Sequence, residues 1–505
     1  MGQWDRLRLD RESAAPLYRQ LAEQIRGWIA TGELAPGERL PPSRELAERL
    51  GVNRNTIASV YDELVKSGDV RSRVGQGTFV AATGPLDSPR APLRFRFSRA
   101  TEAAAERVQK PPVPTSHPDP IDFATLVPDE GLFPIDPFRA VLDDVLRREG
   151  KTLLQYGPAG GYPPLRTYIA ARLAERGVHA TAENVLIVNG SQQGLDLVCR
   201  SLLDPGDRVA LESPTYTIVL PLLAQYHAQT EPIPMTERGM DLEALEAVLD
   251  RSRPKLVFTM PTFHNPTGIT MALDSRKRLL ELTSRYGTPV VEDDFDSELR
   301  FDGDSLPPLK ALDERGSVLH IGTFSKGLFP GLRLGYVVAP EAVVSILGRS
   351  KLIADYHSGL LLQAATLEFC RAGHYDRHLK RLASIYREKS RVLTGALERF
   401  FPREVSWTRP EGGWAFWVTL PEALSAELLL EESARAGVLF TPGTNFFARG
   451  EGDRYLRLSI SKVPTGRIEE GMERLSAILV RHLRSLGTID GGRSRALRHE
   501  PALHI

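Results

Sequence analysis

The sequence predicts two folded domains of different class, joined by a linker. Residues 1–82 hold three short helical patterns followed by two strand-like stretches, which indicates a small α+β winged helix-turn-helix domain. Residues 121–486 alternate apolar runs such as "NVLIVNG" and "TPVVEDD" with helical stretches, which predicts an α/β domain with a mostly parallel central sheet. Residues 83–120 are rich in proline and arginine and predict a partly extended linker. The tail, 487–505, is predicted to be disordered.

Bulk composition excludes several classes of protein. The 505 residues carry no net charge, so binding to nucleic acid has to come from a local patch. The two cysteines, Cys199 and Cys370, form neither a disulfide framework nor a metal cluster, and they favour a reducing cytoplasm. The start, "MGQWDRLRLDRES", has no apolar core for a signal peptide, and no uncharged run reaches the length of a membrane span. We therefore expect a cytoplasmic protein without a metal site or a membrane partner.

The first domain can be assigned helix by helix. Leu17, Leu21, Ile25 and Ile29 have helical spacing, and a glycine follows them. In "PPSRELAERLG", Ser43 is expected to cap a second helix and the final glycine to end it. A third helix is predicted in "VNRNTIASVYDELVKSG", capped by the first asparagine. "DVRSRVGQGTFV" then predicts two short strands around a turn, the shape of a wing.

The stretch "GELAPGERLPPSRELAERLGVNRNTIASVYDELVKSG" resembles the GntR-type winged helix. The resemblance covers about residues 16–80 and implies binding to double-stranded DNA. Arginine can fork onto guanine or phosphate, and asparagine can hydrogen-bond adenine. The positions that match the DNA contacts of that family are Arg44, Arg54, Asn55, Thr56, Gln76 and Gly77.

In the second domain, "GTFSKGLFPGLRLG" carries a lysine that can form an imine, Lys326. A lysine that is shielded from water and close to another cation has a lowered pKa and becomes nucleophilic. Arg333 is a candidate for that cation and for a phosphate clamp, with hydroxyl groups from Thr323 and Ser325. A Ser-Lys pair alone is more often a surface feature.

Other polar side chains follow predicted strands. Asp293 in "VVEDDFDSE" can keep a pyridine nitrogen protonated, although the neighbouring acids are alternatives on chemistry alone. Asn265 in "TFHNPTG" can hydrogen-bond a ring hydroxyl, and Tyr216 in "ESPTY" can stack on a ring. In "VLIVNGSQQGLDLV" a strand, a turn and a helix follow one another, so the first backbone N–H groups of that helix can bind phosphate. Those groups belong to Ser191, Gln192 and Gln193.

Together, and in this order, these motifs resemble fold type I enzymes of the aspartate aminotransferase class, which use pyridoxal 5'-phosphate (PLP). The resemblance covers about residues 121–486 and implies a smaller C-terminal α/β subdomain. It makes Lys326 the aldimine lysine and Asp293 the partner of the ring nitrogen. Arg457 in "YLRLSIS" matches the arginine that binds a substrate carboxylate. Tyr156 matches a tyrosine that reaches the phosphate of the partner subunit, which implies a homodimer.

Two positions depart from that pattern. Phe295 stands where the family usually has a tyrosine that donates to the ring hydroxyl, so efficient transamination is not expected. Ile218 stands where relatives that sense an amino acid can carry a second arginine. A clamp of two arginines for a carboxylate is therefore not expected.

The combination of both domains resembles the MocR-type transcriptional regulators. This resemblance implies a bacterial, nucleoid-associated regulator, a head-to-tail homodimer, and DNA binding that is modulated by PLP or by a small amino compound at Lys326. Two alternatives remain open: a working PLP-dependent aminotransferase with an appended DNA-binding domain, and a regulator whose second domain is only a dimer scaffold. The effector, the operator and the sign of regulation do not follow from the sequence.

Overall fold

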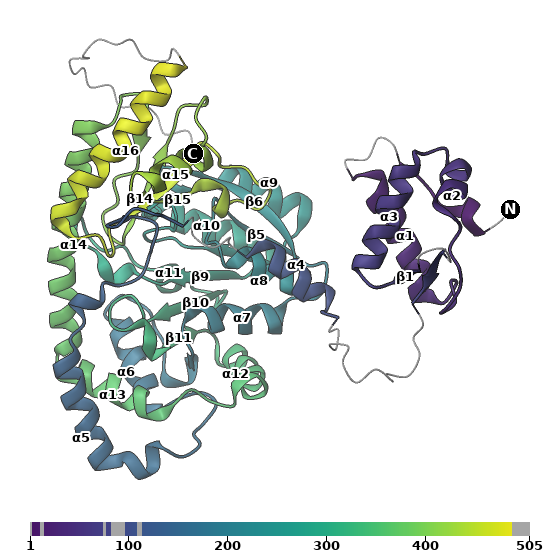
Figure 1. The fold of residues 1–505 in the computed structure, drawn as a ribbon. Coiled ribbons are helices and arrows are strands. Elements are labelled where there is room, and N and C mark those ends of the chain that lie inside the picture. The colour runs from purple at the N-terminus through teal and green to yellow at the C-terminus, as the bar shows by residue number, and fades with distance from the viewer. Residues whose placement is uncertain (1–2, 11–14, 74–76, 82–95, 109–113, 487–505) are drawn as a thin grey trace. The chain divides into compact units, whose positions relative to one another are not determined.

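The computed structural model describes residues 3–10, 15–73, 77–81, 96–108 and 114–486. The chain forms two compact units, Met1–Arg96 and Phe97–Ile505 (Figure 1). We call the first unit the head and the second unit the body, and each is described by itself.

The head consists of three helices and a two-stranded wing, as the sequence predicts. Buried side chains from all three helices form its core, among them Leu21, Leu46 and Ile57. The two strands pair antiparallel, with Val70 opposite Val80. The elements are η1 (Gln3–Arg6), α1 (Leu17–Thr31), α2 (Ser43–Leu50), α3 (Arg54–Lys66), β1 (Val70–Arg73) and β2 (Gly77–Val80).

The turn between α2 and α3 is fixed by local chemistry. Gly51, with a φ of 61°, ends α2 in the left-handed region that glycine adopts at little cost. The Oδ1 of Asn53 accepts the backbone N–H of Asn55 at 2.8 Å and so caps α3, which confirms that prediction. The prediction for Ser43 is wrong, because Ser43 is the first helical residue and Pro42 precedes it in an extended conformation. Pro42 has φ −55° and ψ 141°, so its extended ψ places it before α2 and Ser43 becomes the first helical residue.

Part of the segment 83–120, predicted as a linker, is folded. It contains α4 (Arg99–Arg107), which packs against α8 (Val219–Gln225) of the body. The Oγ of Ser98 accepts the backbone N–H of Thr101 at 3.2 Å and caps α4. A cap and a short helical stretch outweigh the proline-rich flanks here, because α4 has a neighbouring helix to pack against.

The body is built around an eight-stranded mixed sheet. Four adjacent pairs, from β10 to β6, are parallel, while β11 and β7 run in the opposite direction to the other strands. The prediction of a mostly parallel centre is confirmed. Across the sheet the strands are β4 (Val185–Val188), β11 (Gly335–Val338), β10 (Val318–Thr323), β9 (Val290–Asp294), β8 (Leu256–Thr259), β5 (Arg208–Ser213), β6 (Gln229–Thr236) and β7 (Gly239–Met240).

Helices cover both faces of this sheet, because its strand residues alternate between two apolar clusters. Val209 and Leu211 of β5 belong to the cluster that includes residues of α7 and α12, whereas Ala210 between them belongs to the cluster with α9 and α10. The helices of this part are α5 (Ile135–Leu153), α6 (Pro163–Ala174), α7 (Ser191–Leu202), α9 (Leu242–Ser252), α10 (Leu273–Tyr286), α11 (Leu309–Leu312), α12 (Glu341–Asp355) and α13 (Leu360–Arg371).

A smaller C-terminal part adds an antiparallel four-stranded sheet in the order β12-β13-β16-β15. Its long helices α14 and α16 pack against each other (Figure 1). The strand β3, near the beginning of the body, pairs in parallel with β14 of this C-terminal part. The elements are β3 (Ile121–Asp122), α14 (His374–Phe400), β12 (Ser406–Trp407), β13 (Ala415–Thr419), α15 (Ala426–Arg435), β14 (Val438–Leu439), β15 (Thr441–Pro442), β16 (Tyr455–Ser459) and α16 (Thr465–Ser485).

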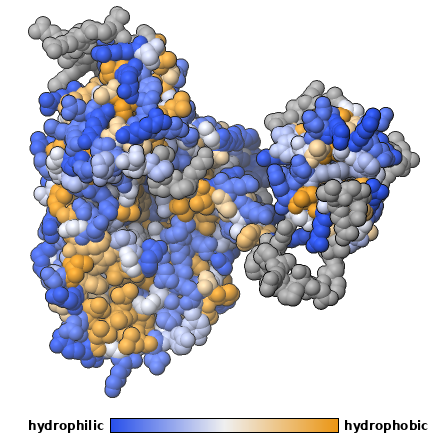
Figure 2. Space-filling model, in the orientation of Figure 1, coloured by the Kyte–Doolittle hydropathy of each residue, from blue (hydrophilic) through white to orange (hydrophobic). Residues whose placement is uncertain are grey.

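The face of the body that Figure 2 shows is mostly polar, with a broad apolar area where Figure 1 places α5, α6 and α13. Within the described residues, no helix combines the length and the apolar character needed to cross a membrane.

Candidate cofactor site and DNA-binding head

The predicted cofactor residues of the body gather because the strands that carry them share one direction. Tyr216 follows β5, Asn265 follows β8, Asp293 lies in β9 and Lys326 follows β10. In an open α/β sheet, ligands bind beyond the carboxyl ends of the parallel strands. The topology of the body therefore brings together side chains that are more than 100 residues apart in the sequence.

Lys326 lies between aromatic rings and charged side chains. Its Nζ donates to the backbone oxygen of Leu126 at 3.0 Å and lies 5.3 Å from the ring centre of Trp414. Burial lowers the pKa of Lys326 to about 8; Asp296 raises the pKa, and Arg457 lowers it further. Arg457 is thus the cation that affects the Lys326 pKa, whereas the sequence had indicated Arg333.

The lowered pKa of Lys326 predicts a pH dependence for the reactivity of this amine. An amine attacks only in its deprotonated form, which for a pKa of about 8 is half populated near pH 8 rather than near the ordinary lysine value of 10.5. Labelling of Lys326 by a small amine-reactive reagent, followed by mass spectrometry at a series of pH values, is expected to rise with a midpoint near 8. Asp296→Asn removes a negative neighbour and is expected to shift that midpoint lower. A wild-type midpoint near 10.5 would contradict the described burial of this amine.

Asp293 has a buried oxygen without a hydrogen-bond partner among the described residues, a feature that it shares with Asp296 of the same motif. Asp293 is 2% exposed, and its unpartnered oxygen is Oδ1. Glu292 instead accepts the backbone N–H groups of Leu309 and Lys310, and Asp294 pairs with Arg176 at 2.7 Å. The structure thus separates two of the neighbouring acids that chemistry alone could not separate from Asp293.

Burial raises the pKa of Asp293 to about 7, and the neighbouring Asp294 raises it further. A buried carboxylate without a donor is costly, so this oxygen fits a cationic N–H donor such as a protonated pyridine ring. Asp293 also raises the pKa of Tyr216, to about 12 together with burial, which is the larger cause. The carboxylate and the predicted stacking ring are therefore close neighbours.

Arg457 and Asn265, predicted to bind different groups of a ligand, contact each other. The Nη1 of Arg457 donates to the Oδ1 of Asn265 at 3.1 Å, and its Nη2 donates to the backbone oxygen of Ala124 at 2.6 Å and to the Oγ1 of Thr441 at 3.1 Å. Burial lowers the pKa of Arg457 to about 10. The Nε of Arg457 is buried without a partner among the described residues. This guanidinium is held in a fixed orientation and can still bind an anion.

The turn between β4 and α7 forms a cup for an anion, which we call the phosphate cup and define as residues 189–193 with Arg333. Gly190 has a φ of 82°, and a Cβ atom there would lie 2.7 Å from the Nη2 of Arg333. That Nη2 donates to the backbone oxygen of Asn189 at 3.1 Å. The backbone N–H of Gln193 donates to Gly190, so the N–H groups of the two preceding residues, Ser191 and Gln192, are the ones placed to bind an anion.

Two hydroxyl groups predicted to bind phosphate lie next to Lys326. The Oγ1 of Thr323 donates to the Oγ of Ser325 at 3.0 Å and to the backbone oxygen of Leu334 at 3.1 Å. Ser325 is buried, so both hydroxyls are ordered by the protein itself.

Two further predicted positions, Tyr156 and Phe295, do not offer a hydrogen bond to the cofactor site within this chain. Tyr156 is 80% exposed, and the centre of its ring lies 5.2 Å from that of Tyr356 of the same chain, with the two rings tilted by 58°. A side chain has to be exposed in this way if it is to reach the phosphate bound to a second subunit. Phe295 lies with its ring 5.9 Å from the Nζ of Lys326 and offers no hydroxyl group.

The structure adds residues that the sequence did not indicate. Trp414 contacts Lys326, and Asp296 is 4% exposed with an Oδ1 that lacks a partner among the described residues. A cavity of about 10 Å³ lies beside Lys326, lined in part by Asp296 and Tyr336. Such a volume suits about one water molecule. Trp414 lies in the stretch "RPEGGWAFW", and only the fold places it beside Lys326.

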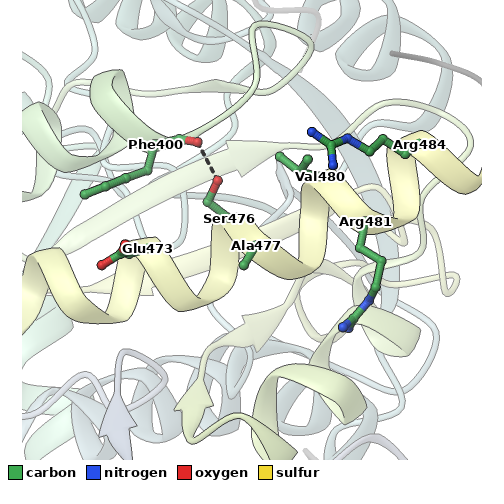
Figure 3. Close-up of a pocket in the computed structure, with 7 residues that line it drawn as sticks. All are labelled: Phe400, Glu473, Ser476, Ala477, Val480, Arg481 and Arg484. Carbon is green, nitrogen blue, oxygen red and sulfur yellow. Dashed lines mark hydrogen bonds between the residues drawn. The ribbon is translucent and has the colours of Figure 1, made fainter. Parts of the chain in front are cut away.

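A larger open groove, of about 480 Å³, lies between the end of α14 and α16 (Figure 3). None of the predicted ligand residues lines it, and Ser476 closes part of it by donating to the backbone oxygen of Phe400. Its lining residues are Phe400, Glu473, Ser476, Ala477, Val480, Arg481 and Arg484. This groove is therefore separate from the cofactor site.

In the head, the predicted DNA contacts gather at two helix starts and one strand start. Arg44 lies in the first turn of α2, and Arg54 and Asn55 open α3; all three are exposed. Thr56 is half-buried, and Gly77, with a φ of 116°, begins β2. Gln76 lies outside the described residues. A Cβ at Gly77 would lie 2.8 Å from the Nε of Arg39, so Arg39 is a further cation beside the wing that the sequence did not single out.

The sequence profile of "Aminotransferase class I and II" matches residues 128–475, which is well over half of the chain. The chain belongs to this aminotransferase family. Its head matches a second profile, "Bacterial regulatory proteins, gntR family", over residues 17–80. The chain is thus a fusion of a GntR-type DNA-binding domain with an aminotransferase-type domain.

Two relatives resemble nearly the whole chain, head and body together. A protein of Rhizobium meliloti described as "Probable rhizopine catabolism regulatory protein MocR" is 34% identical over 97% of this chain and 98% of its own length. The "HTH-type transcriptional regulator TauR" of Rhodobacter capsulatus is 33% identical over 92% of this chain and 96% of its own. These relatives place the chain among the MocR- and TauR-type regulators.

Solved structures of aminotransferases match the body. The crystal structure of LysN, an alpha-aminoadipate aminotransferase from Thermus thermophilus, complexed with N-(5'-phosphopyridoxyl)-L-leucine, has a TM-score of 0.69 and 39% identity. The match covers 72% of this chain and 93% of the LysN chain. The fold type I architecture expected from the sequence is confirmed.

Proposed function

We propose that this protein is a transcriptional regulator whose binding to operator DNA is modulated by PLP held at Lys326. The observation that carries the proposal is the juxtaposition of a half-buried lysine of lowered pKa with a buried carboxylate oxygen, on Asp293, that lacks a donor. This pair lies in the same chain as a GntR-type head. A regulator of bacterial DNA acts in the cytoplasm, where we place this protein.

Each part of the proposed site has one task. Asp293 accepts a hydrogen bond from the ring nitrogen, Asn265 contacts the ring hydroxyl and Tyr216 stacks on the ring. The first N–H groups of α7 and Arg333 bind the phosphate, with the hydroxyls of Thr323 and Ser325 beside them. When bound, PLP supplies an aldehyde that condenses with an amine and releases one water. Lys326 supplies that amine, and its surroundings keep much of it deprotonated near pH 8.

The proposed partners follow from the two units. Arg44, Arg54, Asn55 and Thr56, with Gln76 and Gly77 in the wing, contact double-stranded DNA. The exposed Tyr156 and the apolar area of the body support a homodimer, which the resemblance implies to be head-to-tail. The effector is PLP itself or a small amino compound whose carboxylate binds Arg457.

A second candidate function is a working aminotransferase with a DNA-binding head. It is favoured by the complete set of Lys326, Asp293, Asn265 and Arg457. Phe295 counts against it, because its ring lies near Lys326 and cannot donate a hydrogen bond. Product formation from an amino acid and a 2-oxo acid over many turnovers would favour the enzyme, whereas a single turnover per subunit at most would favour the regulator.

Cofactor titration tests the first step of the proposal. Purified protein is mixed with increasing PLP, and the near-visible absorption is recorded together with retention of the cofactor on gel filtration. Saturation at one PLP per chain supports the proposed site. Absence of any bound PLP would leave a DNA-binding protein with a scaffold body.

A further inference from the structure

The phosphate cup is tied to the end of α12 by an ion pair whose lysine is buried and whose carboxylate is 21% exposed. The Nζ of Lys351 donates to both carboxylate oxygens of Asp355 at 2.6 Å, and the Lys351 side chain is 0% exposed. Burial lowers the pKa of Lys351, and the hydrogen bond to Asp355 opposes this effect. A buried ammonium is tolerated when it is paired, so the two residues depend on each other.

The same carboxylate holds two side chains of the cup. The Oδ2 of Asp355 accepts the Nδ2 of Asn189 at 2.5 Å and the Nε2 of Gln193 at 2.7 Å. The Oε1 of Gln193 in turn accepts the backbone N–H of Asn189 at 2.7 Å. These two residues flank the turn Gly190–Gln192, so Asp355 fixes both ends of the loop that presents the free N–H groups of α7.

The position of Asp355 is unfavourable without these contacts. It is the last residue of α12, where the partial negative charge of the helix end repels a carboxylate. The next residue, Tyr356, has φ 69° and ψ −63°, and the backbone N–H of His357 donates to the oxygen of Asp355 at 2.8 Å. This γ-turn is a strained conformation for a residue with a side chain. Strain of this kind persists where the surroundings hold it, and it concentrates at functional sites.

We propose that Asp355 is a positioning residue for the phosphate subsite, with Lys351 as the cation that neutralises it. The carboxylate turns the amides of Asn189 and Gln193 toward α12, which leaves the N–H groups of Ser191 and Gln192 and the Arg333 guanidinium to an incoming dianion. Lys351 keeps the carboxylate from repelling that dianion. The inference rests on the proposed binding of PLP. It also connects the cup with the exposed ring of Tyr356, which contacts the ring of Tyr156.

The test compares two ligands that differ only in the phosphate: PLP and pyridoxal. Lys351→Met leaves the carboxylate without its cation, so the affinity for PLP is expected to fall about tenfold or more while that for pyridoxal changes by less than about twofold. The double variant Lys351→Met/Asp355→Asn removes both charges and is expected to recover part of the PLP affinity. Because this double variant buries no unpaired charge, it can be used for the same comparison of PLP and pyridoxal if the single variant fails to fold.

Lys389→Met is the matched control, since it removes another buried lysine, one that donates to the backbone oxygen of Ser461 at 3.1 Å and has no contact with the cup. If the pair has a merely structural role, its loss would reduce the affinities for PLP and pyridoxal equally. The Lys389→Met control is likewise expected to change both affinities by the same factor. An unchanged ratio of the two affinities in both the Lys351→Met and double variants would overturn the proposal. If the wild-type protein binds neither PLP nor pyridoxal, the proposed function itself fails, which is a distinct result.

Discussion

Lys326→Ala is expected to abolish covalent attachment of PLP and with it the near-visible absorption band of the protein. The reason is that the amine of Lys326 lies within the cluster of cofactor residues and has a pKa of about 8. Spectra of the wild-type and variant proteins with equal PLP, followed by borohydride reduction and mass spectrometry of the peptides, measure the effect. The whole band is expected to disappear, because no other amine shares this site among the described residues.

A matched control for Lys326→Ala is Lys462→Ala, which removes an exposed lysine of the same unit that pairs with Glu130 at 2.7 Å. This control should retain the band. A band that persists in Lys326→Ala, with label on another lysine, would show that the assignment of the reactive amine is wrong.

The double variant Arg54→Ala/Asn55→Ala is expected to weaken binding to a specific operator about 100-fold, since each lost base contact costs about 1–3 kcal/mol. Both side chains are exposed at the start of α3. The cap of α3 uses the side chain of Asn53 and only the backbone of Asn55, so the fold should tolerate the change. Fluorescence anisotropy with labelled operator at fixed salt measures the affinity, because phosphate contacts depend on salt.

Arg19→Ala is the control for the loss of a positive charge, because Arg19 is an exposed residue of α1 outside the predicted DNA contacts. It should weaken binding to specific and unrelated DNA alike, and only slightly. An equal loss of affinity for both DNAs in the α3 variant would mean that these residues do not provide sequence specificity.

Local signals in the sequence were sufficient to predict most of the helices and strands. The glycine at 51 and the asparagine at 53 mark helix ends through their own backbone preferences, and the structure has both boundaries there. Ser43 was misplaced by one residue because Pro42, with an extended ψ of 141°, occupies the capping position and Ser43 is already helical. The helix α4 was missed because its stability depends on packing against α8, more than 100 residues later.

The candidate site was predictable only in part, since residue types reveal chemistry but not pairing. Asp293 could not be distinguished from Glu292 and Asp294 until these two acids were seen to be occupied by other partners, and Asp296 keeps an unpartnered oxygen as well. Asp355 lies 166 residues from Asn189, and no pattern of spacing connects them. Such contacts are set by how the sheet brings strand ends together.

The most direct test of the central claim is the affinity of the protein for its own upstream DNA with and without PLP, measured for the wild type beside Lys326→Ala. We predict a PLP-dependent change in affinity or in the protected region for the wild type and no such change for the variant. This result would show that the lysine site controls the DNA-binding head. Equal binding in all four conditions, with PLP bound to the wild type, would contradict the account and favour the enzyme.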